Sequence, residues 1–279
     1  MSYFTRRWEG EDKPIAKVLS ALYPELAYSL LVKLLRQKDV FVNGQRQKEG
    51  SIVSRGSTLD LFCTPAMIHL KEIYADDNVL VLYKPKGVET DGDRSFAALA
   101  AFVYGSQTQV MHRLDTNTDG LVLFARNPAA YQALYAAMRD HRVIKYYRAR
   151  VWGRVAEATR LVGYLQKNAE EGKVRVYDVP CEGGQRVCCD ITPLAYDGRT
   201  TLVDVRLEGG KTHQLRAQLA HSGHFIVGDG KYGVDDVNRR LGYKRQQLTA
   251  YRLCFAMAED ALGIDNLVVT LPDELLTTR

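Results

Sequence analysis

The chain has 279 residues, of which 46% are hydrophobic and 25% charged, a composition typical of folded proteins that excludes a disordered chain. No apolar run reaches the roughly 18 residues that cross a bilayer, and the first residues lack a secretory signal, so we expect a cytoplasmic protein. The net charge of +5 permits a nucleic-acid partner without requiring one. The five cysteines have no metal-binding spacing, which predicts reduced thiols.

Residues 12–63 are predicted to form a small basic module. An amphipathic helix opens at Pro24, and its stripe of leucines lies opposite several Lys and Arg residues. A short strand follows at residues 40–42 and ends at an Asn-Gly dipeptide, which tolerates the positive φ angles of a tight turn. A second strand is predicted at residues 59–62. The basic residues indicate either an RNA-binding surface or an ordinary solvated helix face.

The order of these elements resembles the S4 RNA-binding domain. The segment LLVKLLRQKDVFVNGQRQKEGSIVSRGSTLDLF has that domain's helix, basic turn, V-x-V-N-G motif and later glycine before a strand. The resemblance implies that the basic residues of the module face RNA phosphates, where they would supply sequence-independent affinity. These residues are Lys33, Arg36, Lys38 and Arg46. Residues 64–72 are the predicted linker to a larger domain.

The larger domain begins with apolar strands separated by polar loops. Strands are predicted at residues 79–83 and 121–125. Asp115 lies between them, where a strand gives way to a polar loop, so its carboxylate can project into a cleft. Asn127, followed by a proline, is predicted to cap a helix that runs to about residue 141.

A strand at residues 145–152 alternates cleanly between apolar and basic side chains. Tyr147 lies on its apolar side. Between residues 139 and 154 there are six Lys or Arg against one acid, a local basic stripe. The stripe alone indicates an RNA-facing surface and a solvated strand face equally.

A helix is predicted at residues 211–220, with Thr212 as its N-cap and Gly223 as its stop. Arg216 lies beside the apolar face of this helix. An arginine that enters a cleft there needs a carboxylate partner, because an unpaired buried charge is costly. Asp115 is the natural candidate, although the sequence alone does not bring the two together.

Several motifs of cofactor-dependent enzymes are missing. His221 and His224 are three residues apart but lack a third ligand, so a metal site is not expected. The segment around Asp229 is predicted to be a turn and not a calcium loop. No glycine-rich phosphate loop and no cysteine in a nucleophile context are found. The sequence offers a carboxylate, a tyrosine and an arginine, and predicts chemistry without metal or cofactor.

Taken together, five segments of the larger domain resemble the RluA-type pseudouridine synthases. Two of them, HRLDTNTDGLVLFARN at residues 112–127 and KYYRARVWG at residues 145–153, match the family's H-R-L-D and K-x-Y-x-A-x-V-x-G motifs. GGKTHQLRAQLAHSGHFIVGDGKYG, YKPKG and LVVTLPDEL match its other motifs. The chain departs from the pattern at four positions, which leaves the reaction intact and the substrate preference open. These are Asp119, Lys211, Gln218 and Phe225.

The resemblance implies an α+β fold over residues 73–279, with a mixed, largely antiparallel central sheet. It makes Asp115 the essential carboxylate, which either attacks the ribose C1′ or removes a proton at C2′. Tyr147 would pack on the uracil and later help to remove the C5 proton, and Arg216 would pair with Asp115. The implied substrate-binding residues are Arg113, Leu215 and His112. Residues 164–190 fit the family least well and are predicted to be a variable strand-and-loop region.

We therefore expect a monomeric RNA pseudouridine synthase with an RNA partner and no membrane association. The S4-like module favours 23S ribosomal RNA as the substrate, and transfer RNA is the alternative. Two other classes are a non-catalytic RNA-binding factor of ribosome assembly and a glycosidase that releases the base. The presence of both Asp115 and Tyr147 favours the enzyme over the non-catalytic factor.

Overall fold

The computed structural model describes residues 3–63, 70–92, 95–168, 172–207, 209–257 and 262–278. The chain divides into two compact units. The first holds Met1–Lys71 and Glu89–Thr108, and the second holds Glu72–Val88 and Gln109–Arg279. Most of the predicted linker at 64–72 lies outside the described residues. In the part of the chain that is described, no helix is long and apolar enough to cross a membrane.

The first unit is larger than the module predicted at residues 12–63. Its described strands form a sheet in the order β1-β6-β3-β4 and a separate pair of β2 with β5. Its elements are β1 (Tyr3–Arg7), β2 (Lys13–Pro14), α1 (Ile15–Leu22), α2 (Tyr28–Gln37), β3 (Val40–Val42), β4 (Gln45–Arg46), β5 (Ile52–Val53), β6 (Thr58–Phe62) and α3 (Phe96–Tyr104). The sequence did not predict α1 or β1, both of which lie near its start.

The core of the first unit explains where its helices begin. The predicted start of the basic helix at Pro24 is wrong, because α2 begins at Tyr28. The chain before α2 instead turns so that Tyr23 is buried, with its hydroxyl donating to the Leu59 carbonyl at 3.1 Å. The helix α3 adds apolar side chains to this core, and Phe102 stacks on Phe4 with ring centroids 4.0 Å apart.

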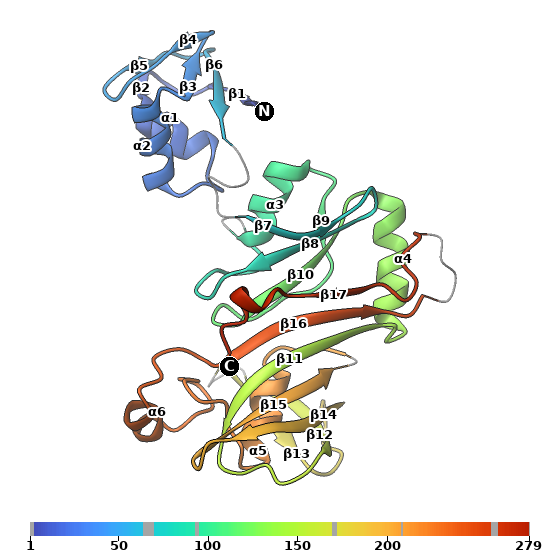
Figure 1. The fold of residues 1–279 in the computed structure, drawn as a ribbon. Coiled ribbons are helices and arrows are strands. Elements are labelled where there is room, and N and C mark those ends of the chain that lie inside the picture. Colours follow the sequence, from blue (N-terminus) through green and yellow to red (C-terminus); the bar gives the residue numbers. More distant parts are fainter. Residues whose placement is uncertain are drawn as a thin grey trace. The chain divides into compact units, whose positions relative to one another are not determined.

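The second unit is built on a mixed sheet (Figure 1). Its described strands run in the order β13-β12-β14-β15-β11-β16-β10-β8-β7, with β17 beside β16 and β9 beside β10. They are β7 (Lys71–Ala75), β8 (Val79–Lys84), β9 (Gln109–Val110), β10 (Asp119–Ala125), β11 (Val143–Trp152), β12 (Thr159–Asn168), β13 (Lys173–Tyr177), β14 (Gln185–Tyr196), β15 (Thr200–Leu207), β16 (Leu248–Phe255) and β17 (Val268–Thr270). The described pair β10–β16 is parallel and the other pairs are antiparallel, so the predicted α+β class with a largely antiparallel sheet is confirmed.

Three described helices and a short 3-10 turn complete the second unit. They are α4 (Pro128–Arg139), α5 (Gln214–His221), α6 (Asp235–Leu241) and η1 (Asp273–Leu275). The predicted cap of α4 is confirmed, because the Asn127 side chain accepts a hydrogen bond from the Ala130 amide. The predicted cap of α5 is wrong. His213, in the left-handed conformation at φ 55°, takes the N-cap position instead of Thr212, and it has no capping side-chain hydrogen bond.

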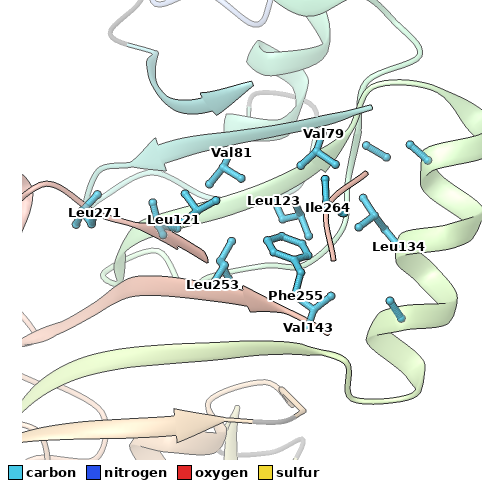
Figure 2. Packing of buried hydrophobic residues seen from close by; sticks show 14 of the residues in the cluster. Val79, Val81, Leu121, Leu123, Leu134, Val143, Leu253, Phe255, Ile264 and Leu271 are labelled. Atoms are coloured by element: carbon cyan, nitrogen blue, oxygen red, sulfur yellow. The ribbon is translucent and has the colours of Figure 1, made fainter. Parts of the chain in front are cut away.

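A large apolar cluster lies between α4 and the central strands. Figure 2 shows Leu134 of α4 facing side chains from β8, β10 and β16, which include Val79, Leu123 and Phe255. Each of these residues is at most 2% exposed. Burial of one such side chain contributes about 1.5–3 kcal/mol, so the cluster anchors the strands that carry the polar loops at their ends.

A close backbone approach sets the geometry where β10 begins. At Gly120 the chain has a φ of 123°, and a Cβ there would lie 2.0 Å from the Ala250 carbonyl oxygen of β16. Only glycine fits this position. The approach fixes the start of β10 against β16, and Asp115 lies in the loop just before it.

Candidate active site

A tight turn holds Asp115 at the start of the site. The Thr118 amide donates to the Asp115 carbonyl at 3.0 Å, which closes the turn before β10. The fully buried Lys84 fixes the same loop from β8, because its Nζ donates to the carbonyls of Val88 at 2.7 Å and Thr116 at 3.4 Å. Burial lowers the pKa of Lys84 to about 8, while the charges of Asp119 and Asp115 oppose that shift.

Arg216 bridges two carboxylates. Its Nη1 donates to Asp115 Oδ2 at 2.7 Å, so the predicted pair of Arg216 and Asp115 is present in the structure. Its Nε and Nη2 donate to both oxygens of Asp229 at 2.7 and 2.9 Å. A two-point bond of this kind fixes the guanidinium plane. The third nitrogen is therefore aimed at Asp115.

Asp229 is one of the residues that sequence analysis missed. The turn predicted there exists, but its carboxylate is 1% exposed and also accepts from the amides of Lys231 and Tyr232. Burial raises the pKa of Asp229, yet its bonds to Arg216 outweigh that effect and hold the pKa below its ordinary value. Burial likewise lowers the pKa of Arg216, but Asp229 and Asp115 together raise it well above normal. Arg216 and Asp229 are therefore both charged at neutral pH.

Tyr147 comes from the buried face of β11. It is 6% exposed, and both burial and the charge of Asp115 raise its pKa well above the ordinary value. Its phenol is therefore protonated in the free protein. The alternation predicted for this strand is confirmed, because every second residue from Val143 to Val151 is buried.

Asp115, Tyr147 and Arg216 line one cavity of about 570 Å³. The predicted substrate-binding residues Arg113, Leu215 and His112 line it too. Leu215 is buried and Arg113 is exposed. A volume of this size, with polar groups placed among apolar ones, suits one small planar group rather than an extended polymer.

His112 is held as a neutral ring. Its Nε2 accepts the Leu123 amide at 3.2 Å. Burial and the nearby charge of Lys145 lower the pKa of His112 to about 3. The imidazole therefore shapes the cavity wall and adds no charge to it at neutral pH.

His213, which was not predicted as a site residue, lies beside Asp115. His213 Nε2 is 3.9 Å from Asp115 Oδ2, and its Nδ1 is 3.0 Å from the Tyr232 hydroxyl. The Tyr232 hydroxyl also accepts the Val174 amide of β13 at 2.9 Å. This chain of contacts links the carboxylate to the edge of the sheet. The signal that could have identified His213 in the sequence is its position two residues after the Gly-Gly-Lys segment.

A buried polar network lies under the Asp115 turn. Asp119, which replaces the serine usual in the resembled family, is fully buried and accepts from the hydroxyls of Tyr83 at 3.0 Å and Thr277 at 2.6 Å. Thr249 donates to its other oxygen at 2.9 Å, and Lys86 lies 3.7 Å away. The departure therefore has a structural role, since Asp119 joins the segment around Thr277 to the loop.

The basic residues predicted to bind RNA belong to the first unit. Lys33, Arg36, Lys38 and Arg46 are all exposed. Arg36 pairs with Glu49 at 3.3 Å, and Arg46 lies over the Phe41 ring. Among the described residues, no group of three or more His, Cys, Asp or Glu is arranged to hold a metal ion.

The fold places the chain in a known class of protein. A solved structure of human RNA Pseudouridylate Synthase Domain Containing 1 superposes with a TM-score of 0.62 at 26% identity, covering 74% of this chain and 84% of that one. A second human protein, RNA Pseudouridylate Synthase Domain Containing 4, shares the fold with a TM-score of 0.58 at 21% identity, over 73% of this chain and 89% of that one. The fold is that of the pseudouridine synthases.

Sequence comparison identifies the family within that class. The RNA pseudouridylate synthase family model matches residues 78–221. Ribosomal large subunit pseudouridine synthase C of Rickettsia conorii is 30% identical over 79% of this chain and 82% of its own length, and that of Rickettsia felis is 30% identical over 92% of each. The chain belongs to the RNA pseudouridine synthases, as the RluA-type resemblance predicted, and is an isomerase.

Proposed function

We propose that this enzyme converts specific uridines of large-subunit ribosomal RNA to pseudouridine, with Asp115 as the reacting carboxylate. The observation that carries the proposal is the 2.7 Å bond from Arg216 to Asp115 inside a cavity that Tyr147 also lines. Asp115 has a second oxygen that this bond leaves available to a substrate. The geometry thus presents a carboxylate, aimed by a cation, beside an aromatic face.

The reaction breaks the C1′–N1 bond of uridine, turns the base over and joins C1′ to C5. Asp115 either attacks C1′ or removes a proton at C2′, and no metal or cofactor takes part in either route. A carboxylate that attacks a sugar carbon has precedent in glycosidases. Because the target base lies in a stacked RNA strand, it must leave the stack to reach the cavity. Leu215 and Tyr147 would then contact the two faces of the uracil, and Arg113 would fill the vacated space.

Burial and, next to it, the charge of Asp115 raise the pKa of Tyr147, so its phenol keeps its proton while Asp115 is charged. On the C1′ route, ester formation removes the charge of Asp115 and with it this part of the shift. The phenol of Tyr147 then ionises more readily than in the free enzyme, and once its own proton has passed to water the phenolate can accept the C5 proton in the later step. On the C2′ route the carboxylate becomes a neutral acid with the same consequence. On either route, the role of Tyr147 therefore falls after cleavage of the C1′–N1 bond.

The substrate assignment rests on named relatives and on the first unit. Ribosomal large subunit pseudouridine synthases C of two Rickettsia species and D of Buchnera aphidicola are similar to this chain over at least 79% of its length. The exposed cations of the first unit, in an S4-like module, would add backbone affinity for a large folded RNA. An enzyme of ribosomal RNA would act in the cytoplasm, where ribosomes assemble. Transfer RNA is the alternative substrate.

Tritium release from RNA labelled at uridine C5 tests the proposal. Ribosomal and transfer RNA from a strain that lacks this gene are incubated separately with the wild-type enzyme and with Asp115→Asn. We expect release from ribosomal RNA by wild type alone. Release from transfer RNA only would reassign the substrate, and release by Asp115→Asn would remove Asp115 from its role. No release from either pool, with full rescue of ribosome profiles by Asp115→Asn, would favour an RNA-binding assembly factor.

A further inference from the structure

Lys145 is a buried cation of strand β11. It lies on the same face of β11 as Tyr147, is 5% exposed and lines the cavity. In the part of the chain that the structure describes, its ammonium makes no hydrogen bond and no salt bridge. Burial alone lowers its pKa to about 8. An uncompensated charge in such a place costs stability, so its presence calls for a ligand that supplies the missing acceptor.

The surroundings of Lys145 leave its ammonium open to the cavity. A Cβ at Gly210 would lie 3.6 Å from Nζ, so a side chain there would cover the ammonium. The nearby His112 is neutral and its Nε2 is already occupied by the Leu123 amide. Two residues along a strand span about 6.6 Å, which places Lys145 next to Tyr147 on the same face of β11 and in the same cavity wall. A planar base that stacks on Tyr147 would therefore present its edge to Lys145.

Burial separates Lys145 from the basic residues at the mouth of the cavity. Those residues are all exposed: Arg113, Arg139, His141 and Lys211. Exposed cations suit RNA phosphates, which stay hydrated, and Arg139 is additionally paired with Asp140 at 2.9 Å. The other buried cation of the cavity, Arg216, is already held by two carboxylates. Lys145 is therefore the cation that suits an oxygen entering the cavity with the base.

Resting on the proposed function, we infer that Lys145 donates a hydrogen bond to a carbonyl oxygen of the target uracil. When the C1′–N1 bond breaks, its electron pair passes to N1 and is shared with O2 and O4. The ammonium then stabilises the uracil anion until C5 bonds to C1′ and the C5 proton leaves. A donor aimed at charge that develops during a reaction acts mainly on the chemical step, typically by about 10²–10³-fold. Lys145 is thus a further catalytic residue.

The first test compares Lys145→Met, which keeps the chain length without charge, with Lys145→Arg, which keeps the charge. Pseudouridine formation is measured in single turnovers at saturating enzyme, on whichever of the two RNA pools the wild type modifies. We expect Lys145→Met to lose about 10²-fold or more in rate with RNA affinity within about threefold of wild type, and Lys145→Arg to retain more of the rate. A tenfold loss of affinity with an unchanged rate would instead make Lys145 a phosphate contact and overturn the inference.

The second test replaces the oxygen itself. RNA transcribed with 2-thiouridine or with 4-thiouridine carries a weaker acceptor at O2 or at O4. One of the two substitutions should lower the rate of pseudouridine formation by the wild type. The same substitution should not lower the rate of Lys145→Met any further. If both substitutions slow Lys145→Met as much as wild type, Lys145 contacts neither oxygen.

Thermal unfolding separates a ligand-binding role from a structural one. Because Lys145→Met removes a buried charge that no described residue pairs, its melting temperature should equal or exceed that of wild type. Glu208 follows the strand residue opposite Lys145 but lies outside the described residues, so Glu208→Gln is the control for a hidden ion pair. A destabilised Lys145→Met matched by Glu208→Gln would overturn the inference. Thermal unfolding needs no substrate. It therefore tests whether Lys145 has a structural partner even if the wild type modifies neither RNA pool and the proposed function fails.

Discussion

The two units of the molecule use charge in opposite ways. In the first unit, the basic residues are exposed, and the Arg36–Glu49 pair leaves 69% of the arginine side chain open to water. In the second unit, Arg216 is 11% exposed and bound to two carboxylates. Exposed cations give affinity that depends on salt and tolerates many geometries, whereas buried pairs give a fixed direction at high desolvation cost. The contrast leads us to expect that exposed cations serve RNA binding and that the buried cation serves the chemistry.

The largest effect on the rate is expected for Asp115→Asn, in the second unit. We expect the rate of pseudouridine formation to fall by about 10⁴-fold or more, because the reacting oxygen is replaced. Stability should change little, since Asp229 still holds Arg216 by two bonds. The measurements are single-turnover rate, RNA affinity by filter binding, and urea unfolding. A variant that unfolds more easily by several kcal/mol would show that Asp115 is chiefly a structural partner of Arg216.

Asp229→Asn should damage stability as well as rate. Breaking a buried ion pair by removal of one partner costs about 3–5 kcal/mol, and Arg216 would also lose its orientation toward Asp115. The matched control is Asp178→Asn, whose carboxylate pairs with His221 but is 82% exposed. That surface pair is worth at most about 1 kcal/mol. Equal urea midpoints for the two variants would contradict the distinction between buried and exposed charge.

The pH dependence of the rate sharpens the comparison inside the second unit. Lys145 must be protonated to donate, and its pKa of about 8 predicts that the rate falls as pH rises above 8. Lys145→Arg should move this fall to higher pH, because arginine stays charged. Lys84 has a similar pKa of about 8 and holds the Asp115 loop. A fall that persists unchanged in Lys145→Arg would therefore assign it to Lys84.

The smallest effect is expected in the first unit. Changing Lys33, Arg36, Lys38 and Arg46 together to Gln should weaken RNA binding and flatten its dependence on salt. The slope of log affinity against log salt should fall by about 0.7–0.9 for each phosphate that the variant no longer neutralises. The rate at saturating enzyme should stay the same, because none of these residues lines the cavity. Binding and salt slope equal to those of wild type would refute the S4-like assignment of this surface.

The sequence predicted local patterns better than partners. The alternation of β11 and the Asn127 cap are properties of neighbouring residues, and both were correct. The Thr212 cap was wrong because His213 adopts a left-handed conformation that no pattern of residue types reveals. Asp229 was missed because its role depends on Arg216, thirteen residues earlier, turning both hydrogen-bonding edges inward. The lack of an acceptor for the Lys145 ammonium among the described residues is likewise a property of the whole cavity, since only folding shows which acceptors lie out of reach.

The helix α3 has a consequence for anyone who would divide the protein. It lies in the chain between β8 and β9 of the second unit, yet its apolar side chains complete the core of the first. The backbone therefore passes between the units three times, after Lys71, Val88 and Thr108. A fragment that begins after residue 71 would lack the core against which Leu99, Phe102 and Val103 pack. These apolar side chains would be exposed, and the fragment would be prone to aggregate. A soluble isolated catalytic unit would require that α3 be replaced by a short polar loop.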